Sequence, residues 1–235
     1  MVDTRYRSDA DEVMDDFSME GEILRDALDK IASINKILGG NKVTLEGVRS
    51  LINKVEPGQE ITILDVGCGN GDMLRTLADY AKRQGLNFKL HGIDANDYTI
   101  RHAISLSGDY PKISFSVQNI LDFRLRDKYD IILCTLTLHH FKDPELLNLV
   151  RYFGERSRLG FVINDLHRSP LAYYLFRLIC ALFRLNDLSR EDGLVSILRG
   201  FKASDLRAYS EALRFTNYSI KWKWAFRYQW IVRSI

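Results

Sequence analysis

Three glycines, Gly67, Gly69 and Gly71, stand at alternate positions after the apolar run ITILDV and before a stretch with helical spacing. A turn without Cβ atoms between a strand and a helix lets the backbone approach a ligand at the carboxyl edge of a parallel sheet. A dinucleotide fingerprint would require glycine at position 72, which is Asp72, and no Gly-Lys-Ser or Gly-Lys-Thr follows for a Walker A loop. The turn therefore departs from both of these nucleotide-binding patterns.

An acidic residue, Asp94, ends the next apolar run, FKLHGID. A carboxylate at that position can accept charge-assisted hydrogen bonds from both hydroxyls of a ribose. Considered alone, an aspartate at a strand end is also a common cap for the following helix. The residue by itself leaves both roles open.

Short apolar runs alternate with helical patterns from Gly58 to Asp165. The expected strands cover 61–66, 88–94, 113–118, 129–136 and 159–165, and the expected helices cover 72–84, 96–107 and 144–153. This alternation is typical of βαβ units in a parallel sheet, and the continuous apolar runs indicate strands that are covered on both faces. We predict a doubly wound α/β sheet that is mostly parallel.

The segments outside this alternation are predicted to be helical or to close the sheet. Helices over 22–38 and from Thr44 to before Pro57 form an N-terminal cap, residues 1–56, ahead of a main domain, residues 57–235. The apolar stretch LAYYLFRLICALFRL lies in a helical insertion, residues 166–202, that we expect to cover a pocket; it is shorter than the ~20 residues a membrane span needs. Its large apolar side chains either line a cavity for an apolar acceptor, lie on a membrane surface, or form an interface with the N-terminal helices or a second subunit; they are Tyr173, Tyr174, Phe176, Leu178, Ile179, Leu182 and Phe183. A helix capped at Ser204 and two strands near 217–224 and 226–232 predict a terminal antiparallel hairpin.

The segment LDVGCGNGD matches at every fixed position the first motif, (D/E)xGxGxG, of the class I S-adenosylmethionine-dependent methyltransferases, which this sequence resembles from about Ile61 to Asp165. The resemblance implies a seven-stranded Rossmann-like sheet, S-adenosylmethionine as cofactor and methyl transfer as the activity. It assigns the ribose to Asp94 and places Asn119 where the family often has an acid that accepts from adenine. The full set of expected cofactor-binding residues is Asp65, Gly67, Cys68, Gly69, Gly71, Asp94, Ala95, Asn119, Ile120 and Thr135.

Histidines follow the fourth and fifth expected strands. His139 and His140 come after the fourth, and Asp165 and His167 end the fifth. A histidine can accept a proton near neutral pH, so these four residues are the catalytic candidates, with Asp165 paired to His140 or His167. The alternatives are that the histidines bond the backbone around the cofactor and that Asp165 caps a helix.

Composition limits the cellular setting. The three cysteines, Cys68, Cys134 and Cys180, show no CxxC or Cys/His spacing, so we expect neither disulfides nor a metal site and favour the cytoplasm. The N-terminus has no apolar stretch typical of a signal peptide. Residues 151–235 hold fifteen basic against seven acidic residues, which indicates either solvated helix faces or an anionic partner.

The expected function is methyl transfer to oxygen or carbon of a small, lipophilic, apolar or aromatic acceptor. The LHHF stretch and the helical cap resemble ubiquinone-biosynthesis and polyketide-tailoring methyltransferases. A nucleic-acid methyltransferase is an alternative that should show an Asn-Pro-Pro-Tyr-like tetrad, and Thr-Leu-Thr-Leu stands there instead, so we expect no nucleic-acid partner. A non-catalytic cofactor-binding subunit and a homodimer stay open.

Overall fold

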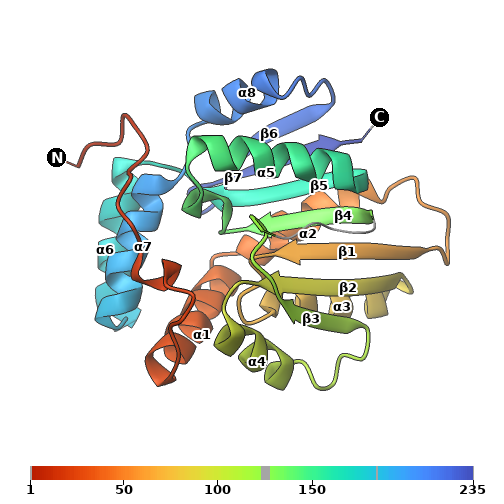
Figure 1. Ribbon diagram of the computed structural model, residues 1–235, viewed down its shortest axis with the longest axis horizontal. Helices are drawn as coiled ribbons and strands as arrows, with labels where there is room; N and C mark the ends of the chain where they lie inside the picture. The colour runs from red at the N-terminus through yellow and green to blue at the C-terminus, as the bar shows by residue number, and fades with distance from the viewer. Residues whose placement is uncertain (1, 123–127, 184, 235) are drawn as a thin grey trace.

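One seven-stranded sheet forms the centre of the protein (Figure 1). The computed structural model describes residues 2–122, 128–183 and 185–234. The strands are β1 (Glu60–Val66), β2 (Asn87–Asp94), β3 (Ile113–Val117), β4 (Tyr129–Thr135), β5 (Ser157–Leu166), β6 (Tyr218–Lys223) and β7 (Arg227–Arg233). Their order is β3-β2-β1-β4-β5-β7-β6, and β7 runs antiparallel to both of its neighbours. The predicted doubly wound sheet with a terminal antiparallel hairpin is confirmed.

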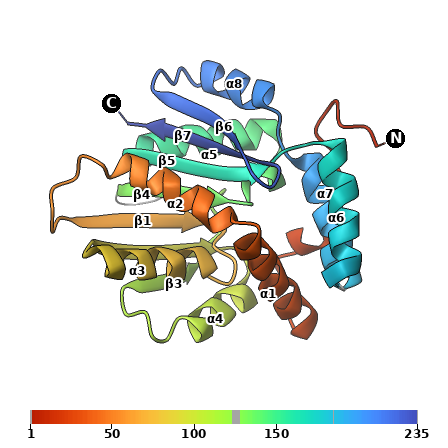
Figure 2. The same ribbon diagram turned by 180° about the vertical axis from the view of Figure 1, so that it is seen from behind.

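Helices cover both faces of this sheet. They are α1 (Glu22–Ile37), α2 (Gly40–Leu51), α3 (Asp72–Gln84), α4 (Asp97–Leu106), α5 (Asp143–Arg156), α6 (Pro170–Phe183), α7 (Asp187–Arg199) and α8 (Ala203–Ala212), with short 3-10 turns η1 (Val13–Asp15) and η2 (Leu138–His140). Figure 2 shows α2 and α3 on one face, and Figure 1 shows α5 and α8 on the other. Ile63 and Leu64, adjacent in β1, are both fully buried because each faces one of these helical layers.

The N-terminal segment and the insertion lie together beyond the carboxyl edge of the sheet, not on its faces (Figure 1). The Ser8 amide donates to the Leu198 carbonyl at 3.0 Å. The buried Asp192 carboxylate accepts from the amides of Val13 and Met14 at 2.8 and 2.9 Å. The expected helices at the N-terminus and in the insertion are present. The residues before α1, α1 itself, α6 and α7 form a layer at the edge where the parallel strands end, whereas α2 packs on a face of the sheet. None of the described helices is long and apolar enough to cross a membrane.

Two helix starts differ from the predictions. Helix α2 begins at Gly40 and not at Thr44, because Gly39 adopts φ +77° and turns the chain directly from α1 into α2. The Thr44 side chain is buried and its hydroxyl lies 3.0 Å from that of Thr135, so it does not cap the helix. Helix α8 begins after Lys202, whose amide donates to Asp205 at 2.9 Å, and Ser204 therefore lies inside the first turn.

Candidate functional site

The glycine turn is held between β2 and the loop that follows β4. The amides of Gly67 and Cys68 donate to the Ile93 carbonyl at 2.9 and 3.0 Å. Gly67 adopts φ +68°, and a Cβ there would lie 2.4 Å from the Thr137 side chain. The Thr137 hydroxyl donates to the Gly67 carbonyl at 3.3 Å. Only glycine fits this position, and the turn is thereby joined to the loop that carries His139 and His140.

Asp94 lies directly beside the turn. One of its carboxylate oxygens accepts from the Gly69 amide and the other from the Asn96 amide, each at 3.1 Å. Burial raises the pKa of this carboxyl above its usual value. Each oxygen keeps a further lone pair for a hydroxyl donor, so Asp94, followed by Ala95, has the geometry expected of a ribose-binding residue.

Two buried oxygen atoms near the turn have no hydrogen-bond partner among the described residues: Oδ1 of Asp65 and Oε1 of Gln118. Burial, with the negative charges of Asp72 and Asp94, holds the pKa of Asp65 well above its usual range. A buried acceptor without a donor is costly, so a cationic or donor-bearing ligand at this turn would stabilise it. Both the charge and the hydrogen-bonding capacity of these residues therefore fit S-adenosylmethionine.

The other expected cofactor-binding residues are either buried or already bonded to groups of the protein. The Asn119 side chain donates to Asp122 at 3.0 Å and accepts from the Leu121 amide at 3.0 Å, so its amide is already used locally. Ile120 is buried in the core, and the Thr135 hydroxyl pairs with Thr44. Cys68 is a buried free thiol at the turn.

The structure pairs Asp165 with His139. Nδ1 of His139 lies 2.7 Å from the Asp165 carboxylate, which also accepts from the His139 amide at 3.2 Å. Burial raises the pKa of Asp165, but the charge of His139 and its hydrogen bond outweigh burial and lower the net value. The predicted pairings of Asp165 with His140 or His167 are therefore wrong, because the 3-10 turn after β4 presents His139 to the end of β5 instead.

His140 pairs with an acid that the sequence did not indicate. Its Nδ1 lies 2.6 Å from the Asp15 carboxylate in η1. His167 lies outside this group: its Nδ1 accepts from the Trp222 indole at 3.3 Å, and its ring packs on Phe226 and Tyr228. Of the four catalytic candidates, His139, His140 and Asp165 are brought together.

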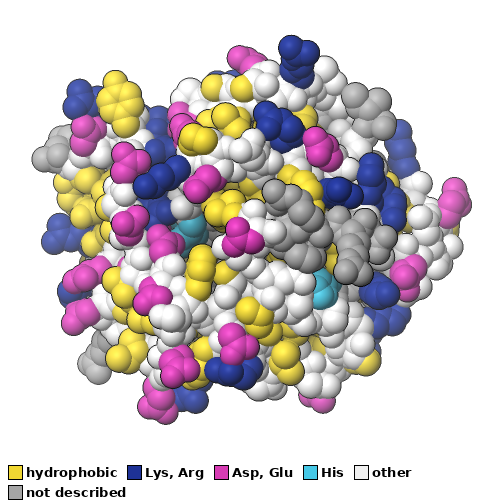
Figure 3. All heavy atoms as spheres, viewed as in Figure 1, with side chains coloured by type: hydrophobic (Ala, Val, Ile, Leu, Met, Phe, Trp, Pro, Cys, Tyr) yellow, Lys and Arg dark blue, Asp and Glu magenta, His cyan; other side chains and the backbone are white. Residues whose placement is uncertain are grey.

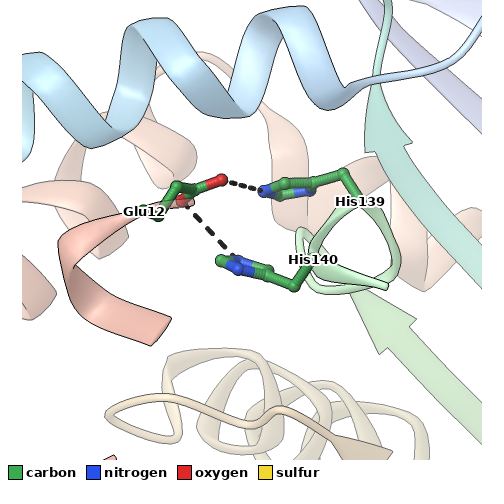
Figure 4. A group of neighbouring side chains, drawn as sticks. All are labelled: Glu12, His139 and His140. Atoms are coloured by element: carbon green, nitrogen blue, oxygen red, sulfur yellow. Dashed lines mark ion pairs between the residues drawn. The ribbon is translucent and has the colours of Figure 1, made fainter. Parts of the chain in front are cut away.

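Glu12 lies between the two histidines (Figure 4). Its carboxylate oxygens are 3.7 Å from Nε2 of His139 and 3.9 Å from Nε2 of His140. Burial raises the pKa of Glu12 to about 7. The Ser196 hydroxyl donates to it at 2.8 Å. No local motif marks Glu12, because its neighbours come from η2 and α7, far along the chain.

Two arginines brace the loop that carries the histidines. Arg7 and Arg199 both donate to the His139 carbonyl, at 3.0 and 3.1 Å. Arg199 also donates to the His140 carbonyl and pairs with Asp15 at 2.7 Å. These bonds hold the two imidazoles relative to the N-terminal segment.

The N-terminal segment is also tied to the cofactor side of the site. The Asn96 side chain donates to the carbonyls of Phe17 and Met19 at 3.0 and 2.7 Å. The Asn70 side chain, inside the glycine turn, donates to Asp29 of α1 at 2.9 Å. The segment that carries Glu12 therefore also contacts residues next to Asp94 and the glycine turn.

Residues 63–158 match the family model described as a methyltransferase domain. This segment is a methyltransferase domain. It includes the glycine turn, Asp94 and both histidines of the cluster. The comparison with curated protein sequences found no match.

Solved structures with a similar fold include other methyltransferases. The plantazolicin methyltransferase BpumL in complex with SAH has a TM-score of 0.67 at 15% identity, covering 91% of this chain and 94% of that one. Magnesium protoporphyrin IX methyltransferase (ChlM) from Synechocystis PCC 6803 has a TM-score of 0.57 at 16% identity and covers 84% of each chain. Human N-acetylserotonin methyltransferase has a TM-score of 0.64 at 14% identity, covering 91% of this chain and 56% of that one.

These likenesses show that the chain has the fold of small-molecule methyltransferases. The predicted enzyme class, a class I methyltransferase that uses S-adenosylmethionine, is confirmed.

The methyltransferase has a cavity of about 430 Å³ behind the histidine loop, lined by His139, Phe141 and several arginines. The arginines bind groups of the protein itself. Arg168, for example, is buried and donates to the Thr4 and Gly200 carbonyls and to Asp205. Part of the basic C-terminal third is therefore structural and not a surface for anions. Figure 3 shows acidic side chains gathered where the N-terminal segment runs.

A second cavity of the methyltransferase, about 740 Å³, lies between α6 and α7. Tyr173, Cys180 and Leu194 line it, together with Arg177 and Arg190. The other apolar side chains of α6 that we expected to line a pocket differ in their exposure. Phe176 and Ile179 are half-buried, whereas Tyr174, Leu178 and Leu182 are exposed; the Phe183 side chain lies outside the described residues.

Proposed function

We propose that the protein transfers a methyl group from S-adenosylmethionine to oxygen or carbon of a small, apolar or aromatic acceptor. The observation that carries this proposal is the meeting of Asp94 and the glycine turn with the histidine cluster at one edge of the sheet. Thr137 contacts Gly67 and stands two residues before His139. When bound, S-adenosylmethionine supplies a methyl group activated on a sulfonium.

The binding residues proposed here act in two ways. The turn 67–71 lets the backbone approach the ligand, and the Asp94 carboxylate accepts from the ribose hydroxyls. Asp65 balances the positive charge of the amino and sulfonium groups. Ala95, Asn119, Ile120 and Thr135 shape the surrounding walls.

The histidines are proposed to accept a proton from the acceptor and to position the residue that does so. A hydrogen bond from Nδ1 to a carboxylate sets the tautomer of an imidazole and leaves Nε2 as the basic atom. In this protein Asp165 orients His139 and Asp15 orients His140. The His140 side chain is the more exposed, 28% against 3% for His139. His140 is therefore the residue that takes a proton from a hydroxyl or carbon acid, and His139 with Asp165 positions it.

The proposed class of acceptor is inferred from the cavity between α6 and α7 and from the structural neighbours. Apolar side chains of α6 and α7 share the lining of a cavity of drug-sized volume with two arginines, Arg177 and Arg190. The structural neighbours are described as acting on plantazolicin, magnesium protoporphyrin IX and N-acetylserotonin. Residues 1–56 and 166–202 act as the cap and the insertion around the main domain. The proposed location is the cytoplasm, because three cysteines without paired spacing are typical of a reducing compartment.

Two measurements test this function. Calorimetry should show stoichiometric binding of S-adenosylmethionine that Gly69→Val abolishes. A screen with labelled S-adenosylmethionine should find label transferred to lipophilic phenols, quinols or acyl chains, and His140→Gln should lower turnover while cofactor affinity is kept. Transfer only to nucleic acids or sugars, or full activity of His140→Gln, would contradict the proposal.

A further inference from the structure

We infer that Glu12, His139 and His140 form a binding site for one divalent first-row transition-metal ion of the Zn²⁺ class. The three residues each present one ligand atom, and these atoms all lie within 4.8 Å of one another. Glu12 stands directly before η1 and both histidines lie in η2, and the three side chains converge as Figure 4 shows. Two imidazoles and one carboxylate are a common ligand set for zinc, with a further position left for water or substrate.

The orientation of both imidazoles matches that of metal ligands. In metal sites the ring nitrogen that does not bind the ion usually donates to a carboxylate, which fixes the ring and its tautomer. Nδ1 of His139 contacts Asp165 at 2.7 Å, and Nδ1 of His140 contacts Asp15 at 2.6 Å. Both Nε2 atoms are therefore left with a free lone pair, and both face Glu12.

The distances around Glu12 suit an ion better than a hydrogen bond. Its oxygens lie 3.7 and 3.9 Å from the two Nε2 atoms. Hydrogen bonds between nitrogen and oxygen are mostly about 2.7–3.2 Å long. Two atoms that each bind one ion at about 2.1 Å are separated by at most about 4.2 Å. The two separations involve different oxygens of Glu12 and fall inside that limit, whereas the three ligand atoms as a set lie within 4.8 Å of one another, so the side chains must draw together slightly to bind one ion.

Two atoms in the cluster are buried without a hydrogen-bond partner in the described part of the chain, although one of them, Oε1 of Glu12, also lies 3.6 Å from the Arg199 guanidinium. Nε2 of His139 and Oε1 of Glu12 have no hydrogen-bond partner among the described residues, and each side chain is 3% exposed. The energetic cost of leaving these atoms unpaired is relieved when both bind the same cation.

The local charge also favours a cation. Three carboxylates, those of Glu12, Asp15 and Asp165, surround the imidazoles, and Arg199 is the guanidinium that pairs with them. The other arginine at this loop, Arg7, pairs with Asp143. With both imidazoles neutral and Glu12 ionised, the group carries an excess of two negative charges. Protons on the imidazoles are the competing way to balance it. A proton on Nε2 of His139 would still have no acceptor within hydrogen-bond distance among the described residues.

Ligand type decides between ions. Imidazole nitrogen suits Zn²⁺ and its first-row neighbours, whereas Mg²⁺ and Ca²⁺ prefer sites built of oxygen atoms. The His140 side chain is 28% exposed, so the cluster has a side open to a further ligand. An ion there would occupy the lone pair on Nε2 of His140 and would itself polarise a hydroxyl or carbonyl oxygen of the acceptor, so the base role proposed for His140 belongs to the metal-free protein. The role of the ion rests on the proposed function, but binding of the ion does not.

The test is titration of the chelator-stripped, full-length protein with Zn²⁺ in competition with a chromophoric chelator, and with Co²⁺ followed by its visible absorption. We expect one ion per chain. Glu12→Gln and His140→Asn should each weaken binding at least tenfold, and Asp165→Asn should weaken it 10- to 100-fold through His139. The matched control is His91→Asn, since both ring nitrogens of His91 lie at 2.8 and 2.9 Å from serine hydroxyls of β3, outside the cluster. It should bind like the wild type.

Three results would overturn the inference: no stoichiometric binding by the wild type, unchanged binding in both Glu12→Gln and His140→Asn, or equal loss in His91→Asn. Circular dichroism of each variant separates loss of the site from loss of the fold. The titration contains neither S-adenosylmethionine nor an acceptor. Failure of metal binding with intact cofactor binding would therefore reject the metal site and leave the proposed methyl transfer standing.

Discussion

Replacement of Asp94 by asparagine tests the cofactor site most directly. The substitution keeps the shape of the side chain and removes its charge. One amide oxygen can still accept from Gly69 or Asn96, but the amide NH₂ then faces the other backbone N–H. That mismatch costs about 1 kcal/mol. Removal of a buried carboxylate whose pKa is raised by burial offsets part of the cost. The free energy of unfolding should therefore change by no more than about 1 kcal/mol.

The effect on cofactor affinity should be larger. A hydrogen bond to a charged group contributes about 1.5–3 kcal/mol. Loss of one such bond to the ribose, with the second weakened, corresponds to a roughly 10- to 100-fold rise in Kd, since about 1.4 kcal/mol is tenfold. Calorimetric titration with S-adenosylmethionine measures this change. Asp97→Asn is the matched control, because Asp97 is exposed, pairs only locally with Arg101 and begins the same helix, α4.

The same reasoning predicts a pH dependence. Ribose hydroxyls donate to the ionised carboxylate, so affinity should be full above the raised pKa of Asp94 and should fall as the pH drops through it. Because burial raises this pKa, the loss should begin at a higher pH than an ordinary aspartate gives. Asp94→Asn should lack this transition. Wild-type-like affinity of Asp94→Asn across the pH range would refute the assignment of the ribose to this residue.

Three further outcomes test the surrounding structure. Gly67→Ala should lower the free energy of unfolding by about 2–4 kcal/mol, because its Cβ meets Thr137 at 2.4 Å and φ is positive, and thermal melts should show partial rescue by Thr137→Gly. Arg168→Leu should cost about 3–5 kcal/mol by leaving buried partners unpaired, whereas Arg158→Leu, at a half-exposed ion pair, should cost about 1 kcal/mol or less in the same denaturant titration. Asp192→Ala should release the N-terminal segment and lower acceptor turnover far more than cofactor affinity; equal losses would count against a separate role for that segment.

The sequence by itself determined the sheet and the cofactor turn. Strand and helix positions follow from periodicity, and runs such as ITILDV are apolar throughout because both faces are covered. The glycine turn was predictable because the backbone conformation at Gly67 excludes a Cβ. Such a constraint appears in the sequence directly as a glycine at that position. Asp94 could be found in the same way, since its position follows from the end of a strand.

Only the tertiary structure decided which groups surround the histidines. Glu12 and Asp15 lie in a polar N-terminal stretch without periodicity, and nothing local distinguishes them from other acids there. They reach His139 and His140 because Asp192, Ser196 and Arg199 of α7 bind that segment. The choice of His139 as the partner of Asp165 likewise depends on how the 3-10 turn η2 packs against the end of β5. Contacts of this kind depend on the packing of distant segments, which hydrophobic spacing does not encode.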